Sequence, residues 1–289
     1  MARVSILGAG RMGAALVRAL AKAGHAVTVW NRTESKARAL EPAGARTARS
    51  LVDAVDADLV IDIVSDYDTS AALLRDAEVQ RALRGTTLLE LASGTPAEAQ
   101  RAGAWAEEHG IRYLDGAIMA TPDFIGQPGC TILYSGPTEL FEAHQATLRA
   151  LADNGLYLGR EIGHANVLDN AILVVLWGAV HGVLHGAAIC EAERFSLATF
   201  RGALRGSWPV VEPLLSSALE RIEGRRWAAD ATTQSALAPG LASVRHLLAI
   251  SEAHGIDAGL PQAFHRVIQR AVERGHRDDD IASAYEGMR

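Results

Sequence analysis

The sequence predicts an α/β protein with an N-terminal Rossmann domain, a long interdomain helix and an all-helical C-terminal dimerisation domain. The Rossmann domain should hold a doubly wound parallel sheet. A glycine turn joins an apolar run to an amphipathic helix near the N-terminus, strand and helix patterns then alternate, and only helical patterns follow. Alternating strands and helices are typical of parallel sheets covered by helices. We therefore predict two domains, residues 1–162 for NADP binding and residues 163–289 for substrate binding and dimerisation.

The first strand, turn and helix predict a dinucleotide site. The apolar run Val4–Leu7 leads into the motif G-x-G-x-x-G. In this motif Gly8 allows a tight turn, Gly10 lets the backbone approach a pyrophosphate, and Gly13 lets the helix pack close to the strand. The helix N-terminus adds free N–H groups and the positive end of the helix dipole. A purely structural turn is the alternative. The cofactor-binding residues predicted here are Gly8, Gly10, Arg11, Met12 and Gly13.

The end of the second strand distinguishes NADPH from NADH. Val27–Trp30 is followed by Asn31-Arg32-Thr33, with Lys36 one turn later. An NAD site carries a carboxylate here, which binds the ribose hydroxyls and would repel a 2′-phosphate. Arg32 can stack on this phosphate or bind it with two hydrogen bonds, and Thr33 and Lys36 can add donors. We therefore predict NADPH, bound by Asn31, Arg32, Thr33 and Lys36; solvated surface cations are the alternative.

Further apolar runs complete the predicted sheet, and Pro96 suits the first turn of a helix. The predicted strands are 59–64, 87–91, 112–114, 131–134 and 156–158, and the helices are 34–40, 50–55, 97–108 and 138–151. Ligands of such sheets bind beyond the carboxyl ends of the strands. The glycine turn, residues 31–33, the loop after Val64 and the segment from Ser93 should therefore surround one crevice. Val64 and Ser65 join the predicted cofactor site on this ground.

A helix of residues 166–191 carries almost no charge, and it has the length of a membrane span. However, Asp169 and Asn170 lie at one end, His181 and His185 interrupt the run, and it has neither basic flanks nor an aromatic belt. A soluble helix that is apolar all round must be buried on every side. One small domain can hardly cover it, so we predict an obligate dimer and no membrane span. The other predicted helices are 197–204, 208–221, 241–254, 261–274 and one from residue 280.

Three side chains are candidates for catalysis. Asp169 is the only carboxylate within the apolar run, and its burial requires a partner or a positively charged ligand; a carboxylate satisfied by backbone donors is the alternative. Trp177, two turns along, is either a cleft wall or a core aromatic. Ser93 follows a strand end on the nicotinamide side, where its hydroxyl either binds substrate or cofactor or simply begins a helix. His181 and His185 lack the glutamate and the third ligand of a zinc helix, so no metal site is predicted.

The composition limits the kinds of binding partner and the cellular compartment that we expect for this protein. Of 289 residues, 49% are apolar and 21% are charged, and the net charge of −6 favours neither nucleic acid nor an anionic membrane. Cys130 and Cys190 have neither metal spacing nor a disulfide framework. No signal peptide is apparent, so we expect a cytoplasmic protein. The three aspartates at 278–280 are predicted to cap the last helix.

Several segments together point to a known family. They are GAGRMG at 8–13, VWNRT at 29–33, SDYD at 65–68, SGTP at 93–96, YLDGAIMATPDFIG at 113–126, ILYSG at 132–136 and GHRDDDIASAYE at 275–286. With them the chain resembles, essentially end to end, the NADP-dependent imine reductases and reductive aminases of the β-hydroxyacid dehydrogenase superfamily. The resemblance implies reduction of imines to amines by NADPH, with reductive amination as a further activity. It also implies a homodimer with reciprocally swapped helices, whose active sites combine residues of both subunits.

The resemblance also ranks the alternatives. The hydroxyacid branch uses a lysine early in the long helix as its acid, and aligning LDNAIL puts Asn166 in that place. Asparagine cannot protonate a developing alkoxide, which disfavours a β-hydroxyacid dehydrogenase. Asp169 matches an acidic residue of the reductive aminases and could stabilise an iminium cation. Where the family often carries Asp or Tyr, Trp177 cannot act as an acid but could form a cation–π wall. A catalytically weak NADPH-binding dimer is the remaining alternative.

Overall fold

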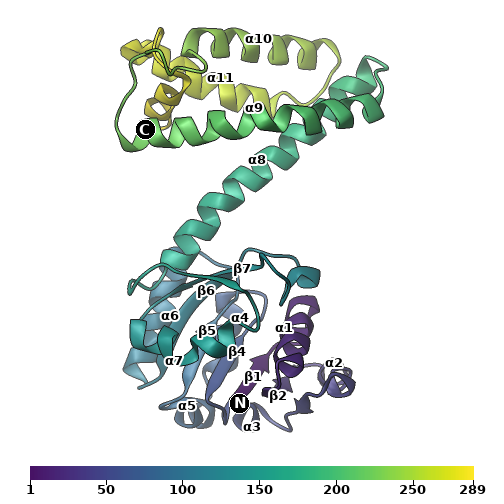
Figure 1. Cartoon of the computed structure of the whole chain (residues 1–289), viewed down its shortest axis with the longest axis vertical. Helices are drawn as coiled ribbons and strands as arrows, with labels where there is room; N and C mark the ends of the chain where they lie inside the picture. Colours follow the sequence, from purple (N-terminus) through teal and green to yellow (C-terminus); the bar gives the residue numbers. More distant parts are fainter. The chain divides into compact units, whose positions relative to one another are not determined.

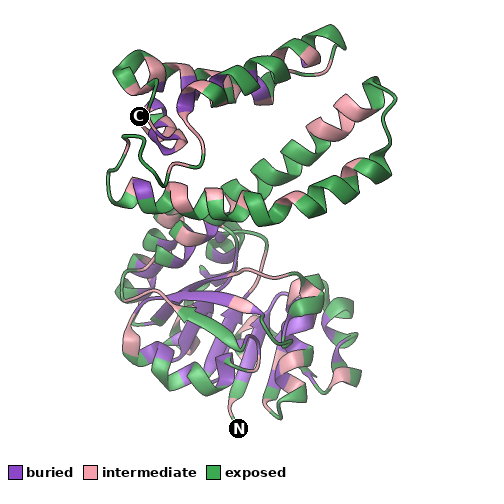
Figure 2. Ribbon diagram, turned by 45° about the horizontal axis from the view of Figure 1, so that its top comes forward, coloured by how far each residue is buried: buried purple, intermediate pink, exposed green.

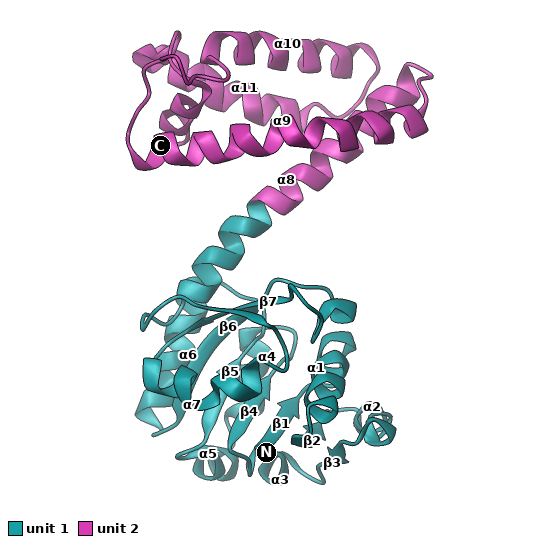
Figure 3. Cartoon of the chain, in the orientation of Figure 1, with its two compact units in different colours: residues 1–174 teal, residues 175–289 magenta.

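The computed structural model describes all 289 residues, which form two compact units, Met1–Val174 and Val175–Arg289 (Figure 3). The border between the units lies inside one continuous helix, α8 (His164–Ala192). The domain border predicted from the sequence, at residue 162, lies just before this helix. The two borders differ because the first turns of α8 belong to the core of unit 1, where Ala165, Asn166 and Asp169 are buried.

Unit 1 contains an eight-stranded sheet with the strand order β3-β2-β1-β4-β5-β6-β7-β8. The strands are β1 (Arg3–Leu7), β2 (Ala26–Trp30), β3 (Arg46–Thr47), β4 (Leu59–Asp62), β5 (Thr87–Glu90), β6 (Arg112–Ile118), β7 (Thr131–Ser135) and β8 (Asn154–Tyr157). All neighbours are parallel except β6 and β7. These two are joined by a loop with a short 3₁₀ turn (Pro122–Phe124) and no crossover helix, a connection that gives antiparallel strands. The strand order reverses between β1 and β4, which is where such sheets bind ligands.

Helices cover both faces of this sheet (Figure 1). They are α1 (Arg11–Lys22), α2 (Glu34–Arg38), α3 (Leu51–Val55), α4 (Tyr67–Leu74), α5 (Ala77–Leu83), α6 (Pro96–Glu108) and α7 (Thr138–Leu148). Successive side chains of a strand point to opposite faces of the sheet. Ile61 and Leu89 therefore pack in a core with α1 and α7. Val60 and Leu88 pack in a core with α3, α5 and α6 on the other face. The sheet is therefore buried on both faces (Figure 2).

Helices α4 and α5 lie where the sequence predicts only a loop at 65–68 and no element after it. Both begin at an aspartate cap: Asp66 accepts a hydrogen bond from the Thr69 N–H at 2.7 Å, and Asp76 accepts one from the Glu78 N–H at 2.7 Å. The periodicity of α4 is hidden in the sequence because its buried face includes Ser70. Its position matters for function, since α4 borders two cavities described below.

Unit 2 is helical. It contains the second part of α8 together with α9 (Leu197–Glu223), α10 (Leu237–Ala253), α11 (Gly259–Ala271), the π-helical turn η3 (Val272–His276) and the 3₁₀ segment η4 (Ile281–Met288). The predicted separation of residues 197–204 from 208–221 is wrong, because α9 continues through Pro209 and Pro213. Each proline removes one backbone hydrogen bond without ending this helix. The small core of unit 2 joins α10 and α11.

A buried arginine holds the end of the chain against α9. The Arg221 guanidinium lies 3.2 Å from the Asp280 carboxylate and 2.6 Å from that of Asp230. Asp280 also accepts a hydrogen bond from the Ala282 N–H at 2.9 Å, so its predicted role as a cap is confirmed. A carboxylate that both caps a turn and pairs with a buried arginine fixes the position of the last segment.

Large apolar side chains are exposed along α8 and α9 in the single chain. By length and composition alone α8 could cross a membrane, but the core helices of soluble proteins often have the same length and composition. None of the apolar stretch of α8 is buried within the chain. The exposed apolar residues of the two helices include Val174, Val175, Leu176, Trp177, Leu184, Leu197, Trp208, Val210, Leu215 and Leu219. A surface of this kind is typical of an interface with another molecule.

Candidate cofactor and active site

The glycine turn lies between β1 and α1, beside the end of β2. Gly8 has a φ of +114°, and its N–H donates a hydrogen bond to the Trp30 carbonyl at 2.9 Å. The Ala9 N–H donates to Asn31 Oδ1 at 3.0 Å, and Asn31 Nδ2 donates to the Thr33 carbonyl at 3.0 Å. The Asn31 amide therefore holds the turn against the end of β2, a structural role beyond the cofactor binding predicted for this residue.

The three glycines have different reasons to be glycine. A Cβ atom on Gly8 would lie 2.8 Å from the Ile63 carbonyl oxygen, and one on Gly13 would lie 1.9 Å from the Gly8 carbonyl oxygen. The fold itself therefore requires glycine at both positions. A Cβ atom on Gly10 would meet no protein atom within 4 Å. The space at Gly10 is open, which suits the close approach of a phosphate group.

Alanine substitutions should separate these roles. We expect Gly13→Ala to lower the free energy of unfolding by roughly 1–3 kcal/mol, because the new methyl group overlaps a backbone oxygen, and to abolish NADPH binding. Gly10→Ala should fold with unchanged stability and still bind NADPH more weakly. Urea unfolding and fluorescence titration with NADPH measure both quantities. Equal loss of stability in the two variants would contradict the assignment.

A cavity of about 620 Å³ opens beside the turn and brings the predicted cofactor residues together. Every one of them lines it: Gly8, Gly10, Arg11, Met12, Gly13, Asn31, Arg32, Thr33, Lys36, Val64 and Ser65. Sequence reasoning missed Trp30, Ile63, Thr69, Ala72 and Leu73, which also line it. The last three lie on α4, and the sequence did not point to them because this helix was not predicted. Trp30 and Ile63 adjoin predicted residues.

The charges in this cavity are of one sign. Arg11, Arg32 and Lys36 line it, and no carboxylate does. Glu34, the nearest acid along the chain, is engaged with Arg38 at 2.6 Å. A cavity with three cations, a glycine turn and a helix N-terminus fits a dinucleotide with an additional phosphate. It lacks the carboxylate that would bind the ribose hydroxyls of NADH.

The predicted substrate residues Ser93 and Asp169 lie on neighbouring segments of unit 1. Asn170, next to Asp169 on α8, donates a hydrogen bond from Nδ2 to the Gly94 carbonyl at 2.9 Å, which ties this part of the helix to the segment of Ser93. Ser93 is exposed and forms a β-bridge with Asp66. Asp169 is only 8% exposed, and no hydrogen bond holds its carboxyl group. Burial raises the pKa of Asp169.

Trp177 is not brought together with these two residues. It lies eight residues beyond Asp169, about 12 Å along the helix axis, in the part of α8 that belongs to unit 2. Its side chain is exposed, and its one aromatic neighbour is His181, with ring centroids 6.1 Å apart. The predicted alternative of a core aromatic is therefore wrong within the single chain.

Asn166 is fully buried and belongs to a polar network at the start of α8. Its Nδ2 donates to Asp115 Oδ1 at 2.9 Å and to the Tyr67 hydroxyl at 3.0 Å, while Tyr67 donates to Asp115 at 2.6 Å. A side chain enclosed in this way cannot reach a substrate. The structure thus gives Asn166 a role in packing α8 against the sheet, and its correspondence to the lysine of the hydroxyacid branch stays a prediction.

A row of buried carboxyl groups crosses the sheet beside this network. Asp62, Glu90 and Asp115 are paired in register on β4, β5 and β6, and none is more than 1% exposed. Ser70 Oγ lies 2.8 Å from Asp62 and 2.5 Å from Glu90. One hydroxyl proton cannot serve both, so one carboxyl group carries a proton. Burial raises the pKa of Glu90 well above its usual value and that of Asp62 to about 6, so this pair retains one proton between its two carboxyl groups.

This row should make folding stability depend on pH. Because the pKa of Asp62 rises from 3.8 to about 6 on folding, its contribution is fully present below the unfolded value and is lost as pH rises through about 6. We expect the wild type to lose roughly 2–3 kcal/mol between pH 4 and 7 relative to Asp62→Asn. Urea unfolding at both pH values measures this. Asp68→Asn, an exposed position on α4, is the control and should follow the wild type.

Comparisons with known proteins bear on both domains. Residues 161–289 match the model of the "NADPH-dependent reductive aminase-like, C-terminal domain", and residues 3–159 match that of the "NAD binding domain of 6-phosphogluconate dehydrogenase". The NADPH-dependent reductive aminase of Aspergillus oryzae is 32% identical over 289 residues, which cover 98% of this chain and 96% of that protein.

Two solved structures are similar over the whole chain. The imine reductase from Myxococcus stipitatus in complex with NADP⁺ is 43% identical with a TM-score of 0.96, and the match covers 99% of this chain and 100% of that one. The reductive aminase from Aspergillus terreus in complex with NADPH and ethyl levulinate is 32% identical with a TM-score of 0.91, and the match covers 100% of both.

Proposed function

This chain belongs to the family of NADPH-dependent imine reductases and reductive aminases, and on that premise we propose that it reduces the C=N bonds of imines and iminium ions to amines with NADPH. The bound cofactor supplies a hydride from C4 of its nicotinamide. The observation that carries the proposal is the cation-lined crevice around the glycine turn. It lies in a chain whose 43% identical relative has a structure in complex with NADP⁺.

Asp169 is the residue of this chain best suited to hold the substrate. An iminium ion carries a positive charge next to the carbon that accepts the hydride. Asp169 is a largely buried residue whose carboxyl group accepts no hydrogen bond from the protein, so a cation beside it would provide the missing counter-charge. Its role is to bind and orient the iminium ion and to stabilise its charge. Ser93, on the segment tied to α8 through Asn170, supplies a hydroxyl at the same end.

The substrates follow from the family. The A. terreus reductive aminase has a structure in complex with NADPH4, cyclohexanone and allyl amine. We infer that this chain likewise takes small ketones and primary amines as well as preformed imines. Reductive amination then requires the site to hold the condensation product away from water while the hydride is transferred.

A homodimer would complete the active site. The exposed apolar side chains of α8 and α9 support the proposal that a partner subunit covers the long helix, and reciprocal swapping of the helices would bury them. We propose that Trp177 then lies against the partner's cofactor crevice as a cation–π wall. This arrangement also accounts for the apolar length of α8 without a membrane.

Light scattering after size-exclusion chromatography tests the dimer. We expect a particle of twice the chain mass of 30.7 kDa at micromolar concentration. Leu184→Asp puts a charge on the exposed apolar face of α8 and should shift the protein towards monomers or aggregates. Glu107→Lys, on an exposed position of α6, is the control and should leave the mass unchanged. A folded wild-type monomer would exclude the obligate dimer.

One assay distinguishes the proposed activity from its alternatives. NADPH absorbance is followed with a panel of cyclic imines and with cyclohexanone plus allyl amine, and NADP⁺ reduction is followed with β-hydroxyacids. We expect turnover of the imines and of the ketone–amine pair. Turnover of hydroxyacids alone would support a β-hydroxyacid dehydrogenase. Tight NADPH binding without any turnover would support a binding protein.

A further inference from the structure

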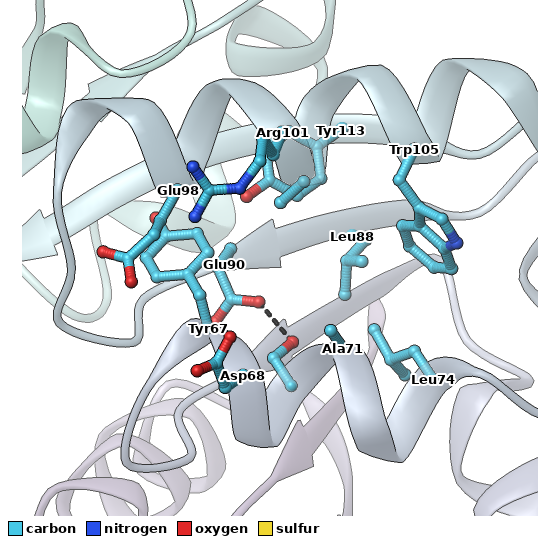
Figure 4. A pocket seen from close by; sticks show the side chains of 12 residues that line it. Tyr67, Asp68, Ala71, Leu74, Leu88, Glu90, Glu98, Arg101, Trp105 and Tyr113 are labelled. Carbon is cyan, nitrogen blue, oxygen red and sulfur yellow. Dashed lines mark hydrogen bonds between the residues drawn. The ribbon is translucent and has the colours of Figure 1, made fainter.

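A second cavity, of about 200 Å³, lies between α4 and α6 (Figure 4). Its floor is the sheet face that carries Leu88, Glu90 and Tyr113. It shares no lining residue with the cofactor crevice, although α4 borders both. The two cavities are therefore separate sites on the two sides of one helix. The volume is enough for several water molecules, or for a ligand with a short chain.

The two ends of this cavity differ in polarity. Leu74, Leu88 and Trp105 surround one end, and Tyr67, Glu90 and Tyr113 lie at the other (Figure 4). The residue Tyr113 is 4% exposed, and its hydroxyl is buried without any hydrogen-bond partner. A buried hydroxyl without a partner is costly, and such groups are rare in proteins. Tyr113 thus offers an unused hydrogen-bonding group to a ligand in this cavity.

The ionisable groups around the polar end are almost all carboxyl groups. Glu90 lies on the floor with Asp62 and Asp115 on the strands beside it, and Asp68 and Glu98 lie on the two helices. Arg101 is the only cation among the lining residues, and it is exposed. No buried cation balances the carboxyl groups of the floor, so an anionic ligand would be repelled and a cationic one attracted.

We propose that this cavity binds a short primary alkylammonium ion. Its ammonium group would lie against the Glu90 carboxyl group and the Tyr113 hydroxyl, and its alkyl chain would lie among Leu74, Leu88 and Trp105. A primary ammonium has three N–H donors, which suits the acceptors at this end. An alcohol of the same length lacks the charge, and a carboxylate has the wrong one. The site is distinct from the place where Asp169 would hold the substrate.

Binding of the ion should release a proton. Glu90 and Asp62 share one serine hydroxyl, so one of these two carboxyl groups carries a proton in the free protein. An ammonium ion beside Glu90 favours the ionised form of both carboxyl groups, so the pair loses this proton to solvent as the ion binds. The balance is one ion taken up and one proton given off. The heat of binding must then depend on the buffer that accepts the proton.

Calorimetry with the full chain saturated with NADPH tests this inference at pH 7, in phosphate and in Tris. The probe is n-butylammonium chloride, with 1-butanol as the uncharged control. In addition to binding at the Asp169 site, we expect a class of sites that releases about one proton per ion and rejects butanol. Glu90→Gln should weaken this class at least tenfold and abolish the proton release. Asp169→Asn, which alters the proposed catalytic site, should leave it unchanged.

Tyr113→Phe removes only the hydroxyl without a partner, so it should fold normally and weaken the same class several-fold even where Glu90→Gln does not fold. The inference is overturned by unchanged affinity in both variants, since the ion then binds elsewhere. Butanol binding as tightly as butylammonium would show that the cavity binds the alkyl chain and does not recognise the charge. Loss of all ammonium binding in Asp169→Asn alone would leave the catalytic site as the only amine site.

Discussion

Replacing Asp169 with alanine should lower the turnover of cyclic imines by roughly 10²-fold while leaving NADPH affinity nearly unchanged. The carboxyl group is buried in the first turns of α8 and has no hydrogen bond within the protein. An iminium ion that binds there loses its water, and the carboxylate replaces that stabilisation. The variant removes the charge but not the cofactor crevice, which contains no residue of α8.

Steady-state kinetics with saturating NADPH measure this effect, and Asp169→Asn is the matched variant because it keeps the size of the side chain without its charge. Both variants should lose turnover if the charge matters. Normal kinetics in both would remove Asp169 from the mechanism.

Trp177→Phe and Trp177→Ala test the proposed cation–π wall. Trp177→Phe should keep much of the activity and Trp177→Ala should lose it. Full activity in both variants would make Trp177 a packing residue.

Replacing Arg32 with glutamate should weaken NADPH binding by roughly 10²-fold, equivalent to about 2.7 kcal/mol. Arg32 is exposed at the end of β2 and lines the crevice with Arg11 and Lys36, where no carboxylate lies. The variant removes one charge-assisted hydrogen-bonding group and puts a negative charge where we expect the 2′-phosphate to bind. NADH lacks this phosphate, so its affinity should fall little or even rise.

Fluorescence titration with both cofactors measures the change, and Arg38→Glu is the control. Arg38 lies near Arg32 in the sequence but pairs with Glu34 and does not line the crevice. Its substitution changes the net charge by the same amount and should leave NADPH affinity nearly intact. Equal loss of NADPH affinity in the two variants would mean that only the overall electrostatic field of the protein attracts the cofactor. NADH binding as tightly as NADPH in the wild type would exclude the predicted preference.

The cofactor crevice could be predicted from the sequence because its parts are local. Gly8 adopts a positive φ at the turn itself, Gly13 is required by its contact with the Gly8 carbonyl, and Arg32 follows the next strand directly. Because ligands bind at the carboxyl ends of parallel strands, Val64 and Ser65 could be assigned to the same site. All of these residues line one cavity.

The elements that the sequence did not reveal have weak local signals. The buried face of α4 includes Ser70, which interrupts the apolar periodicity, and the prolines within α9 resemble a helix end. The antiparallel direction of β7 depends on how its loop returns to the sheet, which no single residue encodes. Local patterns describe an element, whereas its neighbours decide its direction and length.

The sequence by itself determined the two-domain order, the dinucleotide motif and the preference for NADPH, because glycine spacing, strand ends and charges act over a few residues. Only the tertiary structure decided which polar groups are enclosed. It buries Asn166 against Asp115, aligns Asp62 with Glu90, and leaves the Tyr113 hydroxyl facing a second cavity without a partner. These relations join strands that are distant in the chain, and the free energy of burying a polar group depends on all the atoms around it rather than on its position in the sequence.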